Sequence, residues 1–296
     1  MFFAIRSHTI PDVSNQTMKK IIAAFDGLKY AEATAEYAVH IAKQSHAHLV
    51  GVFLDDMIYH SFRFKDVIEN DAVSDKKLKE LNEKDKATRK RAIRLFRTAC
   101  EQAGLEYSVH HDKNVAVKDL LHESIYSDLL IVGKKENFSA YQDKLPSDFI
   151  QELLADVQCP IMVVPEKYKP LQSLIFLYDG DPSSVYATKM FCYHLAALHH
   201  LPAKVLSVKP LEQSLHLPDN HLMKEFMKRH LPKAEYVVLK GEAETIIITY
   251  LQQQTEETMV VLGAYQRGRI SRWFKPSMAD VLMKNTNLPL FIAHNK

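Results

Sequence analysis

The sequence predicts an α/β protein built from two tandem, doubly wound domains, each with a five-stranded parallel sheet and helices on both faces. Three observations support this prediction. The chain has 296 residues, a length that suits two domains of about 150 residues each. Fully apolar runs of strand length alternate with segments of helix length. The order of these segments in the first half is repeated in the second half.

The first half opens with a strand–helix–strand unit. The run IIAAF at 21–25 contains no polar residue, as expected of a strand that is buried on both faces of a parallel sheet. Small apolar residues recur at helical spacing between 30 and 45, and HLVGVFL at 48–54 is the predicted second strand. In a strand–helix–strand unit the helix crosses over the sheet in a right-handed sense and returns the chain in the same direction. The two strands, and the sheet that they begin, are therefore predicted to be parallel.

The rest of the first half is predicted to carry one insertion and one long helix. The irregular insertion covers 55–73 and holds four large apolar residues: Met57, Tyr59, Phe62 and Phe64. A charged helix follows from Asp75 to Ala103 and stops at Gly104, and we interpret its Lys and Glu residues as a solvated face. The remaining predicted elements are strand 105–110, helix 115–125, strand 129–132, helix 147–156 and strand 161–164.

The second half repeats this order. The segment LIFLYDG at 174–180 matches IIAAFDG at 21–27. The elements predicted after it are helix 183–199, strand 204–208, helix 219–230, strand 235–239, helix 242–253, strand 259–262, helix 277–285 and strand 290–293. We therefore divide the chain into an N-terminal arm, a first domain and a second domain, with bounds 1–17, 18–166 and 172–296.

Composition narrows the class of function. Apolar residues make up 47% of the chain and charged residues 25%, and the formal net charge is +2 with both signs interspersed. This balance builds no one-sided basic field, so we expect no nucleic-acid partner. No apolar run reaches the roughly 18 residues of a membrane span, and the N-terminus lacks the pattern of a signal peptide. We therefore expect a cytoplasmic protein with no membrane attachment.

Cysteine and histidine patterns favour structural roles. The three cysteines show no CxxC spacing, so we expect buried thiols in place of disulfides or a zinc site: Cys100, Cys159 and Cys192. Two histidine pairs stand out, and neither has the spacing that places two imidazoles on one helix face: His110–His111 and His199–His200. We therefore expect no metal site.

Two loops share one interval. Gly133 follows the fourth strand of the first half, and Ser147 opens the next helix fourteen positions later. Gly263 and Ser277 stand at the same interval in the second half. This spacing resembles the G-x2-G-x9-G-[S/T] loop of the universal stress protein family. Each half also carries the family's Asp-Gly pair after its first strand, Asp26-Gly27 and Asp179-Gly180.

The resemblance covers nearly the whole chain from Met18, once in each half, and the second half is the closer match. It implies a tandem universal stress protein with Rossmann-like domains. In ATP-binding members, the first-strand Asp and the backbone near the second strand hold adenine, while the loop glycines and Ser/Thr hold ribose and phosphates. The positions implied here are Asp26, Val52, Gly133 and Ser147 in the first half, and Asp179, Val208, Gly263, Gly268 and Ser277 in the second.

The loops depart from the family pattern. The second glycine is replaced by Glu136 and Gln266, and the third by Pro146 and Pro276. A side chain in place of glycine takes space that a phosphate needs, and proline offers no N–H donor. Glu136 also adds negative charge beside a polyanion. We therefore predict degenerate nucleotide sites and a protein that does not depend on ATP. ATP stays open as a cofactor in the second domain alone, where the nearby Gly268 offers a partial substitute.

Three functions remain open. The first is a non-enzymatic stress-response module that binds an unknown protein client. The second is an ATP-binding switch or weak ATPase that uses Asp179, Gly263 and Ser277, although both loop serines also have an interpretation as helix caps. The third is a small-molecule carrier that uses the insertion at 55–73.

The resemblance implies that the halves pair through their last strands, 160–164 and 289–293, as an intramolecular pseudo-dimer that dimerises further. We assign no catalytic residue.

Overall fold

The computed structural model describes residues 18–54, 75–112, 116–137, 144–212, 214–255, 257–264 and 277–294. The arm at 1–17, the insertion at 55–73 and most of the second matched loop, 265–276, lie outside these ranges. The first half contains β1 (Lys20–Asp26), α1 (Glu32–Ser45), β2 (His48–Leu54), α3 (Asp75–Ala103), β3 (Tyr107–Asp112), α4 (Ala116–Ser124), β4 (Leu129–Gly133), α5 (Asp148–Asp156) and β5 (Ile161–Val164).

The second half contains the corresponding elements. They are β6 (Ser173–Leu177), α6 (Pro182–His194), the short 3-10 turn η2 (Ala196–Leu198), β7 (Ala203–Lys209), α7 (Asn220–His230), β8 (Glu235–Lys240), α8 (Ala243–Gln252), β9 (Thr258–Gly263), α9 (Met278–Asn285) and β10 (Leu290–Ala293). The predicted α/β class is therefore confirmed, and most predicted elements lie within two residues of their observed bounds.

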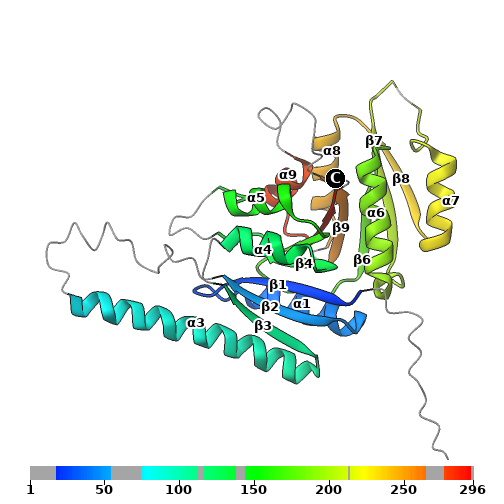
Figure 1. Cartoon of the computed structure of the whole chain (residues 1–296). Coiled ribbons are helices and arrows are strands. Elements are labelled where there is room, and N and C mark those ends of the chain that lie inside the picture. The colour runs from blue at the N-terminus through cyan, green and yellow to red at the C-terminus, as the bar shows by residue number, and fades with distance from the viewer. Residues whose placement is uncertain are drawn as a thin grey trace, which may run out of the picture.

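All ten strands form one sheet in the order β3-β2-β1-β4-β5-β10-β9-β6-β7-β8. The pairs inside each half are parallel, and the two halves meet where β5 and β10 pair antiparallel. Phe291 stands opposite Met162 in this junction. The predicted pairing of the last strands is confirmed. The domain bounds remain a prediction, because one sheet runs through both halves (Figure 1).

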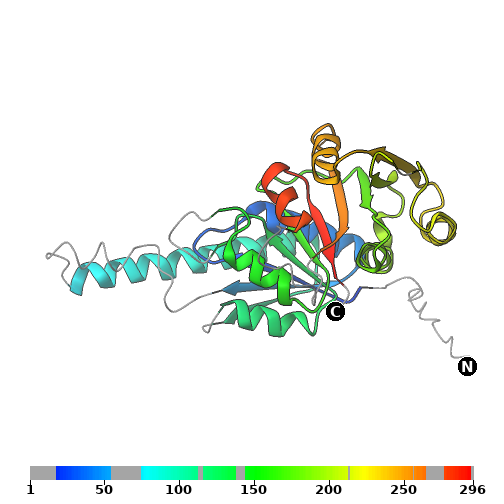
Figure 2. The same ribbon diagram turned by 90° about the horizontal axis from the view of Figure 1, so that it is seen from above.

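Helices cover both faces of the sheet. Buried residues of α1, α3, α6 and α7 pack on one face, where Tyr37, Phe96 and Phe191 are among the largest buried side chains. Buried residues of α4, α5, α8 and α9 pack on the other face. The N-terminal part of α3 projects beyond the sheet as an arm (Figures 1 and 2).

Two predicted bounds were wrong. The strand predicted at 105–110 is β3, which begins at Tyr107, because Leu105 closes α3 by donating its N–H to the Cys100 carbonyl at 3.0 Å. Gly104 beside it has a φ of +67°, so the predicted helix stop is confirmed. The helix predicted at 183–199 ends at His194, because Leu195 leaves the helical region and η2 follows.

Candidate functional site

A cavity of about 980 Å³ opens at the carboxyl ends of β1, β4 and β5. The chain runs outward from β1 to β2 and β3 and then returns to β4 on the other side of β1, so the cavity lies at the switch point where open α/β sheets bind ligands. Asp26, Gly133 and Ser147 line it together with the first turn of α1. Val52 is fully buried in β2 and is not part of this lining.

Asp26 ends β1 and is 1% exposed. Its Oδ1 accepts the Leu28 N–H at 2.8 Å, and its carbonyl accepts the Lys29 N–H at 3.2 Å. These bonds turn the chain from β1 toward α1. The turn interpretation of the Asp-Gly pair is thus observed here, and it leaves Asp26 in the cavity wall.

Gly133 ends β4, and two polar side chains converge on it. A Cβ at this position would stand 3.1 Å from Thr34 Oγ1 and 3.4 Å from Glu136 Oε1. Only a residue without a side chain leaves both groups in place. Thr34, in the first turn of α1, is 1% exposed, and its Oγ1 has no hydrogen-bond partner within the described ranges.

Glu136 turns into the protein and is 7% exposed. Burial raises the pKa of its carboxyl well above the ordinary value of 4.5, and the negative charge of Asp26 raises it further. A backbone hydrogen bond from Asp26 and the charge of Lys29 act in the opposite direction. The sequence led us to expect a negative charge beside the phosphate position, and the structure revises this expectation. The Glu136 side chain fills this space, and its raised pKa favours the protonated, uncharged carboxyl group.

Ser147 is the N-cap of α5 and is buried. Its Oγ accepts the Ile150 N–H at 3.2 Å and donates to the Glu136 carbonyl at 2.6 Å. The hydroxyl proton is therefore already donated within the protein. The capping interpretation of Ser147 is confirmed.

The candidates of the second half do not gather in the same way. Asp179 is exposed in the turn after β6, where its Oδ1 accepts the Asp181 N–H at 2.9 Å. A Cβ on Gly263 would stand 2.5 Å from the backbone of Ser183, so the start of α6 packs directly on this glycine. Ser277 forms a capping box with Asp280 at the start of α9. Val208 is half-buried in β7, and Gly268 lies outside the described residues.

Comparison with known proteins gives a clear result for the fold. No family model and no curated protein matches the chain by sequence. A universal stress protein from Archaeoglobus fulgidus DSM 4304 aligns with a TM-score of 0.68 and 13% identity over 93% of this chain and 98% of that chain. This chain has the universal stress protein fold. A protein of unknown function from Pseudomonas aeruginosa PAO1 aligns with a TM-score of 0.55 and 15% identity over 94% of this chain and 93% of its own.

Within this universal stress protein fold, three of the four lysines that line the cavity in the described ranges are held by other groups, and the charge of the fourth, Lys29, acts on Glu136. Lys134 is 7% exposed, and its Nζ donates to the Thr286 carbonyl at 3.0 Å and to Asn287 Oδ1 at 2.6 Å. Burial lowers the pKa of Lys134. The next two lysines form ion pairs, Lys135 with Glu166 at 2.7 Å and Lys144 with Asp148 at 3.5 Å.

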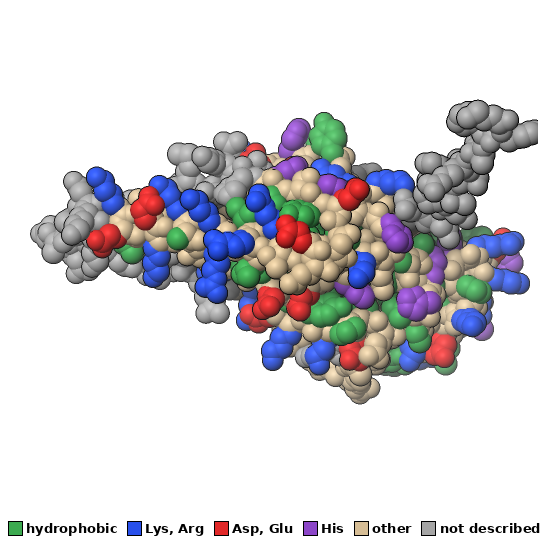
Figure 3. Space-filling view, turned by 90° about the horizontal axis from the view of Figure 1, so that it is seen from below, with side chains coloured by type: hydrophobic (Ala, Val, Ile, Leu, Met, Phe, Trp, Pro, Cys, Tyr) green, Lys and Arg blue, Asp and Glu red, His purple; other side chains and the backbone are tan. Residues whose placement is uncertain are grey.

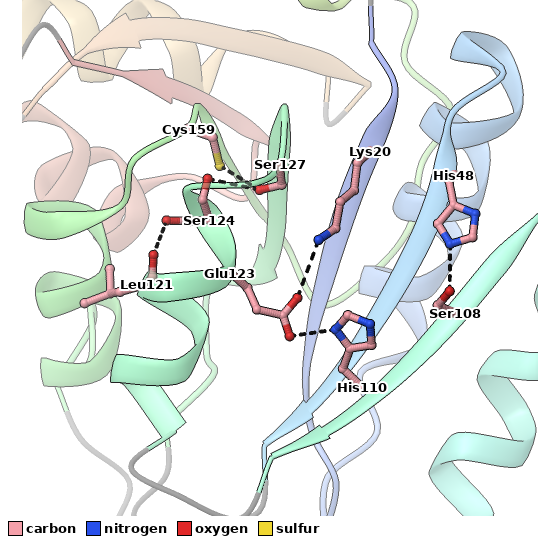
Figure 4. Close-up of polar contacts among 9 residues, drawn as sticks. All are labelled: Lys20, His48, Ser108, His110, Leu121, Glu123, Ser124, Ser127 and Cys159. Carbon is pink, nitrogen blue, oxygen red and sulfur yellow. Dashed lines mark hydrogen bonds and ion pairs between the residues drawn. The ribbon is translucent and has the colours of Figure 1, made fainter.

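The histidines of this universal stress protein fold take structural contacts. His110 Nδ1 lies 2.7 Å from Glu123 Oε1, and Glu123 Oε2 lies 3.8 Å from Lys20 Nζ (Figure 4). His200 Nδ1 bonds the Ala197 carbonyl at 2.8 Å. In the described residues, no cluster of three or more His, Cys, Asp or Glu side chains is arranged to hold a metal ion. The three predicted buried thiols are confirmed.

Sequence reasoning missed two residues of the cavity. Thr34 interrupts a run of alanines on the buried face of α1, and this polar residue on an apolar face was the available signal. Lys134 follows the loop glycine directly, but nothing in the sequence indicates that its ammonium reaches the segment before β10.

In the described part of the chain, no helix is long and apolar enough to cross a membrane.

Proposed function

We propose that this protein is a non-enzymatic binding and regulatory module of the stress response, with a first nucleotide site that has lost its capacity for ATP. The observation that carries the proposal is the position of Glu136. Its loop position belongs to a glycine in the resembling family, and its side chain lies buried against Asp26 and Gly133. A nucleotide phosphate cannot share this volume with the carboxyl group.

The rest of the loop supports the same proposal. Pro146 has no N–H, and the Ser147 hydroxyl donates to the Glu136 carbonyl. The ammonium groups of Lys134 and Lys135 are held by Asn287 and Glu166. A phosphate chain would therefore find few donors here, whereas an ATP site at a helix N-terminus depends on several. We propose that the protein binds a partner and catalyses no reaction at this loop, because the polar side chains of the loop are already engaged in contacts within the fold.

Thermal unfolding with and without millimolar ATP and magnesium tests this proposal. We expect no shift in Tm for the wild-type protein. We expect Glu136→Gly to acquire an ATP-dependent rise, because a ligand at 100 times its Kd adds about 2.7 kcal/mol to the free energy of unfolding. Glu136→Gln is the matched control, since it keeps the volume of the side chain and should remain unresponsive.

Ser277→Ala separates the two halves in this experiment. A rise in Tm for the wild-type protein that Ser277→Ala abolishes would replace our proposal with the ATP switch of the second half. Losing a helix cap costs about 1 kcal/mol by itself, so the ATP-dependent change is compared within each variant. A wild-type rise that Glu136→Gly leaves unchanged would also contradict the proposal.

A small ligand other than ATP is the second candidate, and Thr34 favours it. Its buried Oγ1 lacks a partner in the described residues, and it lies in the wall of a cavity as large as many ligand sites. We expect native mass spectrometry of the purified protein to detect a bound small molecule that is reduced in Thr34→Val. An unliganded wild-type protein would remove this candidate.

A further inference from the structure

Exposed basic side chains are concentrated on helix α3. Between Lys84 and Arg97 six basic side chains are exposed: Lys84, Lys86, Lys90, Arg91, Arg94 and Arg97. The only acidic residue in this stretch is Asp85, which is 2% exposed. Figure 3 shows Lys and Arg side chains along the projecting arm. We call these six residues the basic face of α3.

The spacing of these residues places them on one side of the helix. Lys86, Lys90, Arg94 and Arg97 follow one another at intervals of four, four and three residues and form one stripe. Lys84 and Arg91 lie together along one edge of this stripe. Within the described ranges, Lys86 alone of the six forms an ion pair, with Glu83 at 2.7 Å. None of the other five lies within ion-pair distance of a carboxylate in these ranges, although the charge of Lys90 also acts on Glu83.

This arrangement does not help the helix itself. Like charges at intervals of three and four residues destabilise a helix by a few tenths of a kcal/mol per pair. The opposite side of α3 already supplies its attachment, because Ala92, Phe96 and Cys100 are buried in the core. A stripe that opposes helix stability and takes no part in packing indicates a role outside the folded chain.

We propose that the basic face of α3 binds the phosphate backbone of a nucleic-acid duplex without reading its sequence. From Lys84 to Arg97 the helix rises about 20 Å, so its six charges are spaced on average about 4 Å apart along the helix axis. One strand of a DNA duplex carries a phosphate about every 3.4 Å. Arginine guanidinium groups, as on Arg91, Arg94 and Arg97, bind phosphate oxygens in pairs.

Two other binding partners, a membrane and a second copy of this chain, fit less well. A helix that lies on a membrane inserts an apolar face into the lipid, and the apolar side of α3 is buried in the protein. A second copy of this chain would bring the same positive charge toward the first. The balanced composition led us to expect no nucleic-acid partner, but an average over 296 residues conceals a local excess on one helix face.

Fluorescence anisotropy with a labelled mixed-sequence DNA duplex tests the proposal on the full-length protein. With about four phosphate contacts, the logarithm of the binding constant should fall with the logarithm of salt concentration with a slope near −3.6. Arg91→Gln/Arg94→Gln/Arg97→Gln should lower the affinity at least tenfold and flatten the slope by about 2.7.

The control variant Lys228→Gln/Arg229→Gln/Lys233→Gln removes the same charge from the second half and should retain wild-type affinity. Circular dichroism checks that both variants keep their helix content. Equal losses in the two variants, absence of binding at about 50 mM salt, or tighter binding to anionic vesicles or polyglutamate than to the duplex would overturn the proposal.

Discussion

Glu136 and Asp26 bring two carboxyl groups together at the carboxyl edge of the sheet. Both side chains are buried, and the burial of Glu136 together with the charge of Asp26 raises the pKa of Glu136. Two carboxyl groups in such a place resist full ionisation, because each negative charge disfavours the other. The two buried carboxyl groups, and the proton that the raised pKa of Glu136 favours, therefore decide which ligands this cavity can accept more than its positive charges do.

Glu136→Gln should remove a pH dependence of stability. Since the pKa of Glu136 is higher in the folded state than in the unfolded state, its protonated form stabilises the fold at low pH. That contribution is lost as pH rises from the ordinary value of 4.5 through the raised pKa. We expect the wild-type free energy of unfolding to fall by at most about 1.4 kcal/mol per pH unit across this window, relative to the variant.

Urea unfolding of both proteins at a series of pH values measures this difference. A constant difference between wild type and Glu136→Gln across the whole range would contradict the assignment of a raised pKa.

At the residue scale, glycine and serine spacing in the sequence singled out residues that the structure brings together. Asp26, Gly133 and Ser147 do line one cavity. The inward turn of Glu136 was not predictable, because it depends on the space beside Thr34 and Asp26 that only the packing of α1 on β4 defines. Val52 was selected from the resemblance alone, and its side chain is buried in the core on one face of the sheet.

At the element scale, α3 packs closely on β2 at Gly51. A Cβ on Gly51 of β2 would stand 2.6 Å from the Phe96 ring, closer than real contacts allow. Phe96 also contacts Phe25 and Phe53 edge to face, with ring centroids 5.5 and 5.9 Å apart. The apolar stripe predicted this helix with its observed bounds, 75–103. The surface on which this apolar stripe packs was not predictable, because the Phe96 ring lies over Gly51, a strand residue that has no side chain.

Gly51→Ala should therefore destabilise the protein by about 1–3 kcal/mol, since the added methyl group forces the Phe96 ring aside. The midpoint of urea unfolding measures the loss. The double variant Gly51→Ala/Phe96→Leu, with a smaller side chain at 96, should lose less than the sum of the two single variants. Additive losses would show that the two residues do not limit each other.

At the scale of the whole molecule, the junction between β5 and β10 joins the two halves into one sheet. Phe291 at this junction is fully buried and meets Phe191 of α6 edge to face at 5.5 Å between ring centroids. Lys134 adds a second link, from the end of β4 to Thr286 and Asn287. The repeat in the sequence predicted two similar halves. The pairing of their last strands was implied only by the family resemblance, and its antiparallel direction is seen only in the structure.

We expect the two halves to unfold in a single transition. Hydrogen-exchange mass spectrometry in urea reports on peptides of each half separately, while far-UV circular dichroism reports on both halves together. Phe291→Ala should shift the signals of both halves equally by about 3–5 kcal/mol. Gly51→Ala in the first half should shift the signal of the second half as well. Separate transitions for the two signals would mean that the halves are independent folding units.

The central claim is that a buried, proton-favouring Glu136 occupies the first nucleotide site. Carbon-13 NMR of labelled glutamate side chains tests it most directly, with Glu136→Gln used to assign the signal. We predict that the Glu136 carboxyl keeps its proton well above the pH at which exposed glutamates titrate, and that added ATP leaves its signal unchanged. A Glu136 signal that titrates near its ordinary value of 4.5, or that shifts on addition of ATP, would contradict the account.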